Sequence, residues 1–246
     1  MAVQFWQDMS ILEGGLELAG HGKSVEVVGD CNALDVTPLS TSDGWTVLLP
    51  GFKTGSVSLE FMQDMTDGSV DDTLWTNFGA AKVVRSIVTA SADGSAAYLM
   101  RGITLAYTPL SGAVGEVASG SVRSTVSQGP LARGVLLHPS NVSRTSSSTG
   151  TGRQIGAVAS GRTMYAALHV LSVSGTSPTL DVIVQSDDNA GFTSPTSRIT
   201  FSQASTVSAQ WGSVAGAITD DYWRITYTIG GTGTPTFAFA VAAGIV

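Results

Sequence analysis

The chain has 246 residues and a formal net charge of −7, from 12 Lys and Arg against 19 Asp and Glu. Only 13% of the residues are charged and 29 are Gly, a balance that favours strands and turns over helices. Tight nucleic-acid binding needs clustered Lys and Arg, so an acidic chain is not expected to hold DNA tightly. No apolar run approaches the roughly 20 residues that span a bilayer, and the Met1 end lacks a basic and an apolar segment, so neither membrane insertion nor export is expected.

The negative charge is confined to the first part of the chain. Residues 1–138 contain seven Lys and Arg and fourteen Asp and Glu, whereas the remaining residues contain five of each sign. One interpretation of these acids is that they only keep the surface soluble.

Cys31 is the single cysteine. It excludes an internal disulfide and fits a reducing cytoplasm. Nothing nearby in the sequence would lower the pKa of its thiol, so we expect a buried small hydrophobe and not a nucleophile.

The first part of the chain alternates between strand and turn patterns. Residues 1–20 lack clean periodicity and suit an extended arm, residues 23–28 alternate as a strand, and residues 30–42 form a polar loop of about a dozen residues. Residues 45–49 predict an apolar strand and residues 50–55 a turn rich in Pro and Gly. Residues 56–62 then predict a strand with Val57, Leu59 and Phe61 on one buried face, which completes a hairpin.

A short helix is predicted directly after this hairpin. Ser69, Asp71 or Asp72 can accept hydrogen bonds at its start, and Gly79 ends it. Four apolar residues fall at helical spacing and predict an amphipathic helix that packs on a sheet: Val70, Leu74, Trp75 and Phe78.

Further strands follow at residues 81–89, 96–109 and 116–127, and Asp93-Gly94 is a favoured hairpin turn. The fold class is therefore mainly β. Residues 1–138 predict one domain of about six strands and one helix, curled into a sandwich or half-barrel.

Four pieces of this region, in this order and spacing, resemble the major tail tube proteins of long, non-contractile-tailed bacteriophages. The pieces are Ala33-Leu34-Asp35-Val36-Thr37, the run from Leu49 to Leu59, the acidic helix, and the run from Tyr107 to Gly112. The likeness covers about residues 20–135, an ordinary domain length. Phe52 stands where that family more often has leucine, and Thr54 where it often has aspartate.

The resemblance implies a virion subunit with no catalytic residue, cofactor or metal. It implies hexameric rings, stacked into a tail tube whose inner wall is a β-barrel that carries the tape measure protein and then DNA. An acidic lining would suit such a conduit, because it would release DNA without holding it, and this is a second hypothesis for the acids of residues 1–138. Tail terminator and distal tail proteins would be further partners, and assembly would occur in the bacterial cytoplasm. A loop implied to contact neighbouring subunits or the next ring contains Asp35, Val36, Thr37, Pro38, Leu39, Ser40 and Trp45.

Residues 139–152 are rich in Ser, Thr and Gly and predict a linker. Residues 153–246 hold about seven short strand candidates separated by turns, which predicts a jelly-roll-like β-sandwich domain. Because such a linker would uncouple two cores, we expect residues 1–138 to assemble on their own.

The sequence offers little chemistry. Residues 20–24 (GHGKS) lack the first glycine of a phosphate-binding loop, and His21, His138 and His169 lack zinc spacing. Asp187-Asp188 and Asp220-Asp221 predict turns more readily than a calcium site.

Two function classes stay open. One is the tube subunit, and the other is a carbohydrate-binding or host-binding module with a stacking surface of Trp211, Tyr222 and Trp223, although Trp223 also fits a core position. No acid, base and nucleophile set can be assembled, so an enzyme is not expected.

Overall fold

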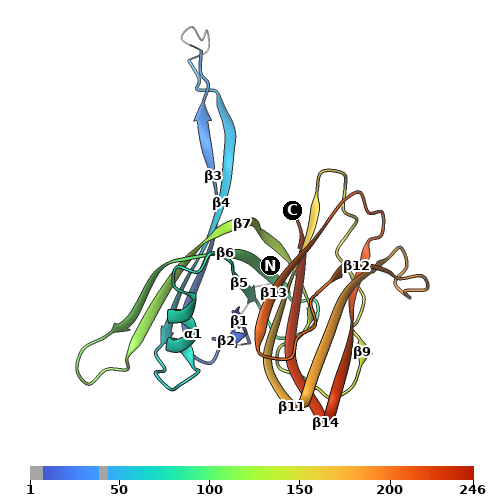
Figure 1. Cartoon of the computed structure of the whole chain (residues 1–246). Coiled ribbons are helices and arrows are strands. Elements are labelled where there is room, and N and C mark those ends of the chain that lie inside the picture. The colour runs from blue at the N-terminus through green and yellow to red at the C-terminus, as the bar shows by residue number, and fades with distance from the viewer. Residues whose placement is uncertain (1–7, 39–43) are drawn as a thin grey trace.

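The computed structural model describes residues 8–38 and 44–246, and the described chain is mainly β (Figure 1). One helix, α1 (Val70–Asn77), lies among strands that join into one large antiparallel sheet. The strands are β1 (Ser10–Glu13), β2 (Leu16–Glu17), β3 (Gly22–Asp35), β4 (Leu48–Met62), β5 (Val83–Val88), β6 (Ala96–Ser111), β7 (Ser119–His138), β8 (Ser143–Arg144), β9 (Ser148–Thr149), β10 (Arg153–Gln154), β11 (Thr163–Asp187), β12 (Thr196–Thr200), β13 (Ser208–Ala215) and β14 (Tyr222–Ile245). The predicted mainly-β fold class is confirmed.

The predicted hairpin within residues 45–62 is wrong, because β4 runs straight through Pro50 and Gly51. Its partner is β3, which extends to Asp35 through much of the predicted loop. Pro50 lacks an N–H, but β4 pairs with β7 only from Ser56 onward, so Pro50 lies on an open edge where no donor is required. The register shift between Cys31 and Ala33 accommodates Gly51.

Cys31 is exposed, which corrects the expectation of a buried thiol. It lies on β3 opposite Lys53, beyond the last contact between β4 and β7. A strand with no sheet beneath it exposes both of its faces, and the local sequence contains no sign of this.

The core of the N-terminal half lies between β4 and β7 on one side and β1 and β5 on the other. Val57, Leu59 and Phe61 are at most 3% exposed, as their alternation predicted. α1 closes the core with Val70 and Leu74.

A buried ion pair ties α1 to this core. The Arg85 guanidinium donates to Glu13, with Nη2–Oε1 at 2.5 Å, and also to Thr104, while Asn77 at the end of α1 donates to Glu13. Because both charges are at most 1% exposed, loss of either partner would strand the other in the interior, at a cost of about 3–5 kcal/mol.

The C-terminal half is a ribbon of β11 and β14 folded back on itself. Four of the short strand candidates, residues 164–174, 179–186, 222–229 and 236–241, fall here, but the structure has two long strands that pair continuously. Register shifts between Val170 and Thr179 mark the bend. Figure 1 shows both strands reaching one end of this half, where their labels stand. Side chains from both sides of the bend share one core, including Leu168, Leu180 and Trp223, which gives a sandwich.

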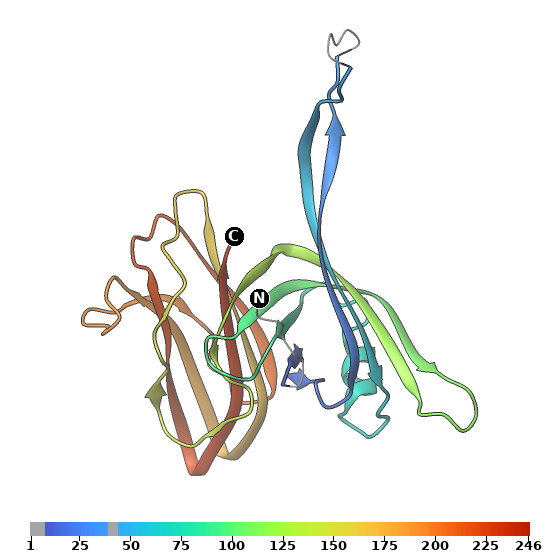
Figure 2. The same cartoon turned by 180° about the vertical axis from the view of Figure 1, so that it is seen from behind.

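Strand pairing joins the two halves. The second half of β7 pairs with β6 on one side and with β14 on the other, and Figure 2 shows β7 passing from one half to the other. Gly134 and Gly244 are Cα partners here, and a Cβ on Gly134 would lie 1.8 Å from the Ala243 carbonyl oxygen. Only glycine permits this approach.

A third apolar cluster lies at the junction and takes residues from both halves. Its buried members are Leu12, Val84, Val88, Ala97, Leu99, Ala132, Leu136, Ala167, Ala240 and Ala242. At the same place, Ser86 Oγ lies 3.0 Å from His169 Nε2. These contacts weigh against two uncoupled cores.

The predicted linker contacts both halves. β8 and β9 pair with β14, and Ser140 Oγ lies 3.0 Å from Ser10 Oγ. The division at residues 139–152 stays a prediction.

We expect Gly134→Ala to lower the free energy of unfolding by about 2–4 kcal/mol, because the added methyl group overlaps β14 backbone. Gly20→Ala is the matched control, since a Cβ there meets no atom within 4 Å, and it should stay within about 0.5 kcal/mol of the parent. Urea unfolding measures both. Equal effects would show that the junction is not tightly packed.

Lowering the pH from 7 to 5 should lower the free energy of unfolding. Burial lowers the pKa of His169 from 6.5 to about 3 and that of His138 to about 4. Between pH 7 and 5, both histidines therefore bind protons in the unfolded chain and stay neutral in the folded chain. Each histidine then contributes up to about 1.4 kcal/mol per pH unit below 6.5. Urea unfolding at both pH values tests this, and His169→Gln should reduce the difference. A variant that keeps the full difference would contradict the assignment.

Candidate assembly surfaces

The sheet β3-β4-β7-β6 ends in two open edges within the described residues. β3 pairs only with β4, and the second half of β6 pairs with β7 and makes one bridge, from Thr104 to Phe78, on its other side. Unpaired N–H and C=O groups are a template for another chain. The four strands are antiparallel in turn, so β3 and β6 run in opposite directions. A β6 edge beside the β3 edge of a second copy would therefore pair antiparallel.

One face of this sheet is polar and exposed to solvent. Because Val57, Leu59 and Phe61 point into the core, the residues between them on β4 point to the opposite face. The strand register places further hydroxyl and charged residues beside them. The face carries Ser24, Glu26, Ser56, Ser58, Glu60, Ser121, Arg123, Thr125 and Thr108, together with the apolar residues Val28 and Leu105. Small hydroxyls dominate it, with two carboxylates and one guanidinium, so it is weakly acidic.

Beyond this sheet, β3 and β4 continue as a two-stranded ribbon, here called the arm (residues 29–38 and 44–55). Figures 1 and 2 show it projecting away from both halves. An isolated pair of strands is marginal in water. Its exposed apolar side chains are Leu34, Val36, Trp45, Val47, Leu48, Leu49 and Phe52, of which Phe52 is 89% exposed. Such a surface is suited to burial against another chain.

The arm's far end holds most of the residues predicted to contact neighbouring subunits. The Asp35 carboxylate accepts hydrogen bonds from Thr37 N at 2.9 Å and Thr37 Oγ1 at 2.6 Å, and these bonds lower the pKa of Asp35. Thr37 Oγ1 in turn accepts a bond from Val47 N at 2.8 Å. This network shapes the turn, and Val36, Pro38 and Trp45 lie beside it. Leu39 and Ser40 lie outside the described residues, and the contact role of the set stays a prediction.

α1 buries two of the four residues predicted to pack on the sheet. Val70 and Leu74 are fully buried, whereas Trp75 is 63% and Phe78 48% exposed. The helix starts without a side-chain cap from Ser69, which donates to Asp64 instead. Tyr107 Oη donates to Asp71 Oδ1 at 2.5 Å and so fixes the start of α1, while burial and this bond raise the pKa of Tyr107 to about 12. The exposed aromatic pair is a further surface that helical periodicity did not reveal.

The described residues contain no group of three or more His, Cys, Asp or Glu arranged to hold a metal ion. Asp187 accepts bonds from Asn189 N and Ser194 N in the turn that follows it, whereas Asp220 accepts bonds from Ser186 Oγ and Arg198 Nη2. No described helix is long and apolar enough to cross a membrane.

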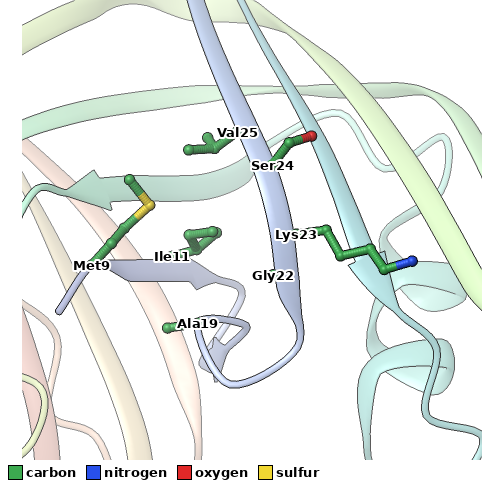
Figure 3. A pocket seen from close by; sticks show the side chains of 7 residues that line it. All are labelled: Met9, Ile11, Ala19, Gly22, Lys23, Ser24 and Val25. Carbon is green, nitrogen blue, oxygen red and sulfur yellow. The ribbon is translucent and has the colours of Figure 1, made fainter. Parts of the chain in front are cut away.

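A pocket of about 340 Å³ lies between β1 and β3 (Figure 3). Apolar side chains such as Met9, Ile11 and Val25 line it, and Figure 3 shows Lys23 directed away from them. Its polar lining residues are Lys23 and Ser24, and no Asp, Glu or His is among them.

The three aromatic residues considered for sugar stacking do not form one surface. Trp223 is fully buried, and its Nε1 donates to the Gly156 carbonyl oxygen at 2.9 Å. Trp211 packs beside Tyr165, with ring centroids 5.5 Å apart, at the junction between the halves. The core position of Trp223 was one of the two interpretations of the sequence, and it is confirmed.

No family model matches the chain, and no curated protein matches its sequence. Among solved structures, it is similar to a chain of the virion of a native gene transfer agent particle, at 17% identity and a TM-score of 0.42, over 52% of this chain and 98% of that one. It is also similar to a chain from the sheath/tube terminator of PVC, an extracellular contractile injection system, at 9% identity and a TM-score of 0.42, over 52% of this chain and 96% of that one.

The Dit protein of SPP1, described as a paradigm of the hub adsorption apparatus in phages that infect Gram-positive hosts, is similar over 98% of this chain and 100% of that one, at 11% identity and a TM-score of 0.38. At such values these are likenesses of fold and do not extend to function.

Leu74→Ala and Trp75→Ala, neighbours on α1, test the packing of the helix. Leu74→Ala should cost about 2–5 kcal/mol of unfolding free energy because it leaves a cavity, whereas Trp75→Ala should cost less than about 1 kcal/mol in the monomer. Chemical denaturation at low protein concentration measures both. A larger cost for Trp75→Ala would mean that α1 is rotated in solution.

Proposed function

We propose that the chain is a structural subunit of a bacteriophage tail tube, which forms stacked rings around a tape measure protein and a conduit for DNA. The observation that carries the proposal is the β3-β4-β7-β6 sheet, which has two open edges of opposite direction and one polar, weakly acidic face. Copies joined edge to edge and head to tail close into a ring. The polar face then becomes the inner wall.

The wall's chemistry fits a conduit. Carboxylates of Glu26 and Glu60 repel phosphates and outnumber the one guanidinium, that of Arg123, and the surrounding hydroxyls offer only weak, exchangeable hydrogen bonds, so passing DNA is not held. In the proposed tube, Glu26 and Glu60 would be the residues of the acidic lining.

The arm supports a second interface. A ring needs one interface, and a tube needs another that stacks rings without closing. The apolar arm, which projects beyond the polar face, supplies a surface for it. The sequence resemblance to tail tube proteins adds the expected number of six copies per ring, the tape measure as cargo, and the tail terminator and distal tail proteins as partners.

The proposed role is structural and not enzymatic, and the proposed place is the tail of the virion, after assembly in the host cytoplasm. No cofactor is required. The C-terminal half would lie on the outside of the tube, because β7 carries it away from the polar face.

Negative-stain electron microscopy of the purified, concentrated protein tests the proposal. We expect stacked rings or tubes with a central hole. If mixing with purified tape measure and tail terminator proteins also yields only monomers, the tube role is wrong.

Phe52→Ser should impair assembly without unfolding the monomer. Phe52 is 89% exposed on the arm, so its loss should change unfolding free energy by less than about 0.5 kcal/mol while reducing the pelletable fraction at a fixed concentration. The control is Val207→Ser, at an exposed apolar residue of the C-terminal half. Equal pelleting of the two variants would exclude the arm from the interface.

A further inference from the structure

The hairpin that joins β6 to β7 ends in an exposed apolar tip, here the β6–β7 tip (residues 110–118). Val114 is fully exposed, and Leu110 and Val117 are 62% and 65% exposed. The loop is shaped by Gly112 and Gly115, both at positive φ, and by Glu116, whose carboxylate accepts a bond from Ala113 N at 3.1 Å. Three apolar side chains on a compact turn form a protruding knob.

A groove of about 540 Å³ lies at the foot of the arm, here the arm-foot groove. It forms because β4 leaves β7 after the Ser56–Thr125 pair, while β7 bulges between Val126 and Leu131 opposite a single β6 residue. Its lining is largely apolar and includes the end of the chain: Val126, Pro130, Leu131 and Val246, with Asp30, Cys31 and Lys53 at the arm side. Its volume is ample for several aliphatic side chains.

A β6–β7 tip cannot fill the groove of its own chain. Along β7, the extended run from Ser119 at the tip to Val126 at the groove covers about 23 Å. Figures 1 and 2 show the tip and the arm pointing in different directions from the shared sheet. The groove and the tip can therefore meet only between two copies.

We propose that the β6–β7 tip of one copy docks in the arm-foot groove of a copy in the next ring. This inference rests on the proposed tube function and names its stacking contact. Val114 and Val117 would pack against Pro130, Leu131 and Val246, which removes apolar surface from water on both sides.

Charge favours the same partner. Glu116 lies at the tip and Lys53 at the groove, so docking brings opposite charges together. Asp30 also lines the groove and keeps its negative charge while its carboxylate accepts a hydrogen bond from Cys31 N at 2.7 Å, so the attraction requires that Glu116 meet the groove at Lys53. Knob and groove are different surfaces, so the contact is heterologous and repeats without closing, as a stack of rings requires.

The single native cysteine makes a direct test possible. One population carries Cys31→Ser with Val114→Cys, and a second population, with a larger tag, keeps native Cys31. The two are co-assembled and treated with a mild oxidant, and a non-reducing gel is expected to show a band that contains one chain of each. A disulfide needs Cα atoms within about 7 Å, so the band reports docking closely.

Cys31→Ser with Val207→Cys is the control, because Val207 is an exposed residue on the C-terminal half, and it should give no mixed band. A charge exchange adds an independent readout. Lys53→Glu and Glu116→Lys should each raise the concentration needed for assembly several-fold, and the double exchange should restore it.

The outcomes separate the two proposals. Tubes that form without a mixed disulfide and without rescue by the double exchange would overturn the docking and leave the tube function standing. Absence of rings and tubes in the parent protein would overturn the tube function itself. A mixed band at the control position equal to that from Val114→Cys would also overturn the docking.

Discussion

Backbone pairing along β7 is the constraint on which the rest of the structure depends. A strand of this length must satisfy its N–H and C=O groups on both sides. β7 does so with β4 and β6 in its first half and with β6 and β14 in its second. The change of partner at the bulge after Val126 turns one sheet into two differently oriented halves and opens the groove at the foot of the arm. Gly134 allows β14 to approach closely enough to pair with the second half of β7.

The same requirement is left unmet at the outer edges. The described residues provide no partner for the outer edge of β3 or for most of the second half of β6, and the arm has only its own two strands. Most apolar residues of the other strands are buried, whereas Phe52 and Val114 are exposed. Exposed apolar surface of this kind is typical of proteins that assemble with other chains. In the proposed tube, neighbours would pair with these edges and cover these side chains.

Buried polar contacts fix orientation where apolar packing alone would allow sliding. Glu13 and Arg85 hold the end of α1 through Asn77, and Ser86 with His169 marks one register between the halves. A buried charge pair or a buried neutral imidazole is costly unless its polar atoms keep their hydrogen-bond partners. Both contacts therefore favour one arrangement of the strands and the helix. That geometry leaves Trp75 and Phe78 outward, beside the open β6 edge.

The sequence by itself determined the features that depend on neighbours along the chain. The period-two pattern of Val57, Leu59 and Phe61 identified a buried face, the Asp93-Gly94 pair identified the turn between β5 and β6, and Val70, Leu74 and Gly79 placed α1. Each of these is set by local geometry and side-chain period.

Only the tertiary structure decided what depends on distant partners. Pro50-Gly51 has the composition of a turn and yet lies within β4, because no backbone N–H donor is required of Pro50 at the open edge. Cys31 is exposed because no sheet lies beneath the arm, and the short strand candidates fused into β11 and β14 because each supplies the other's hydrogen bonds across the bend. Which edge is paired, and which face is covered, are properties of contacts that sequence periodicity does not encode.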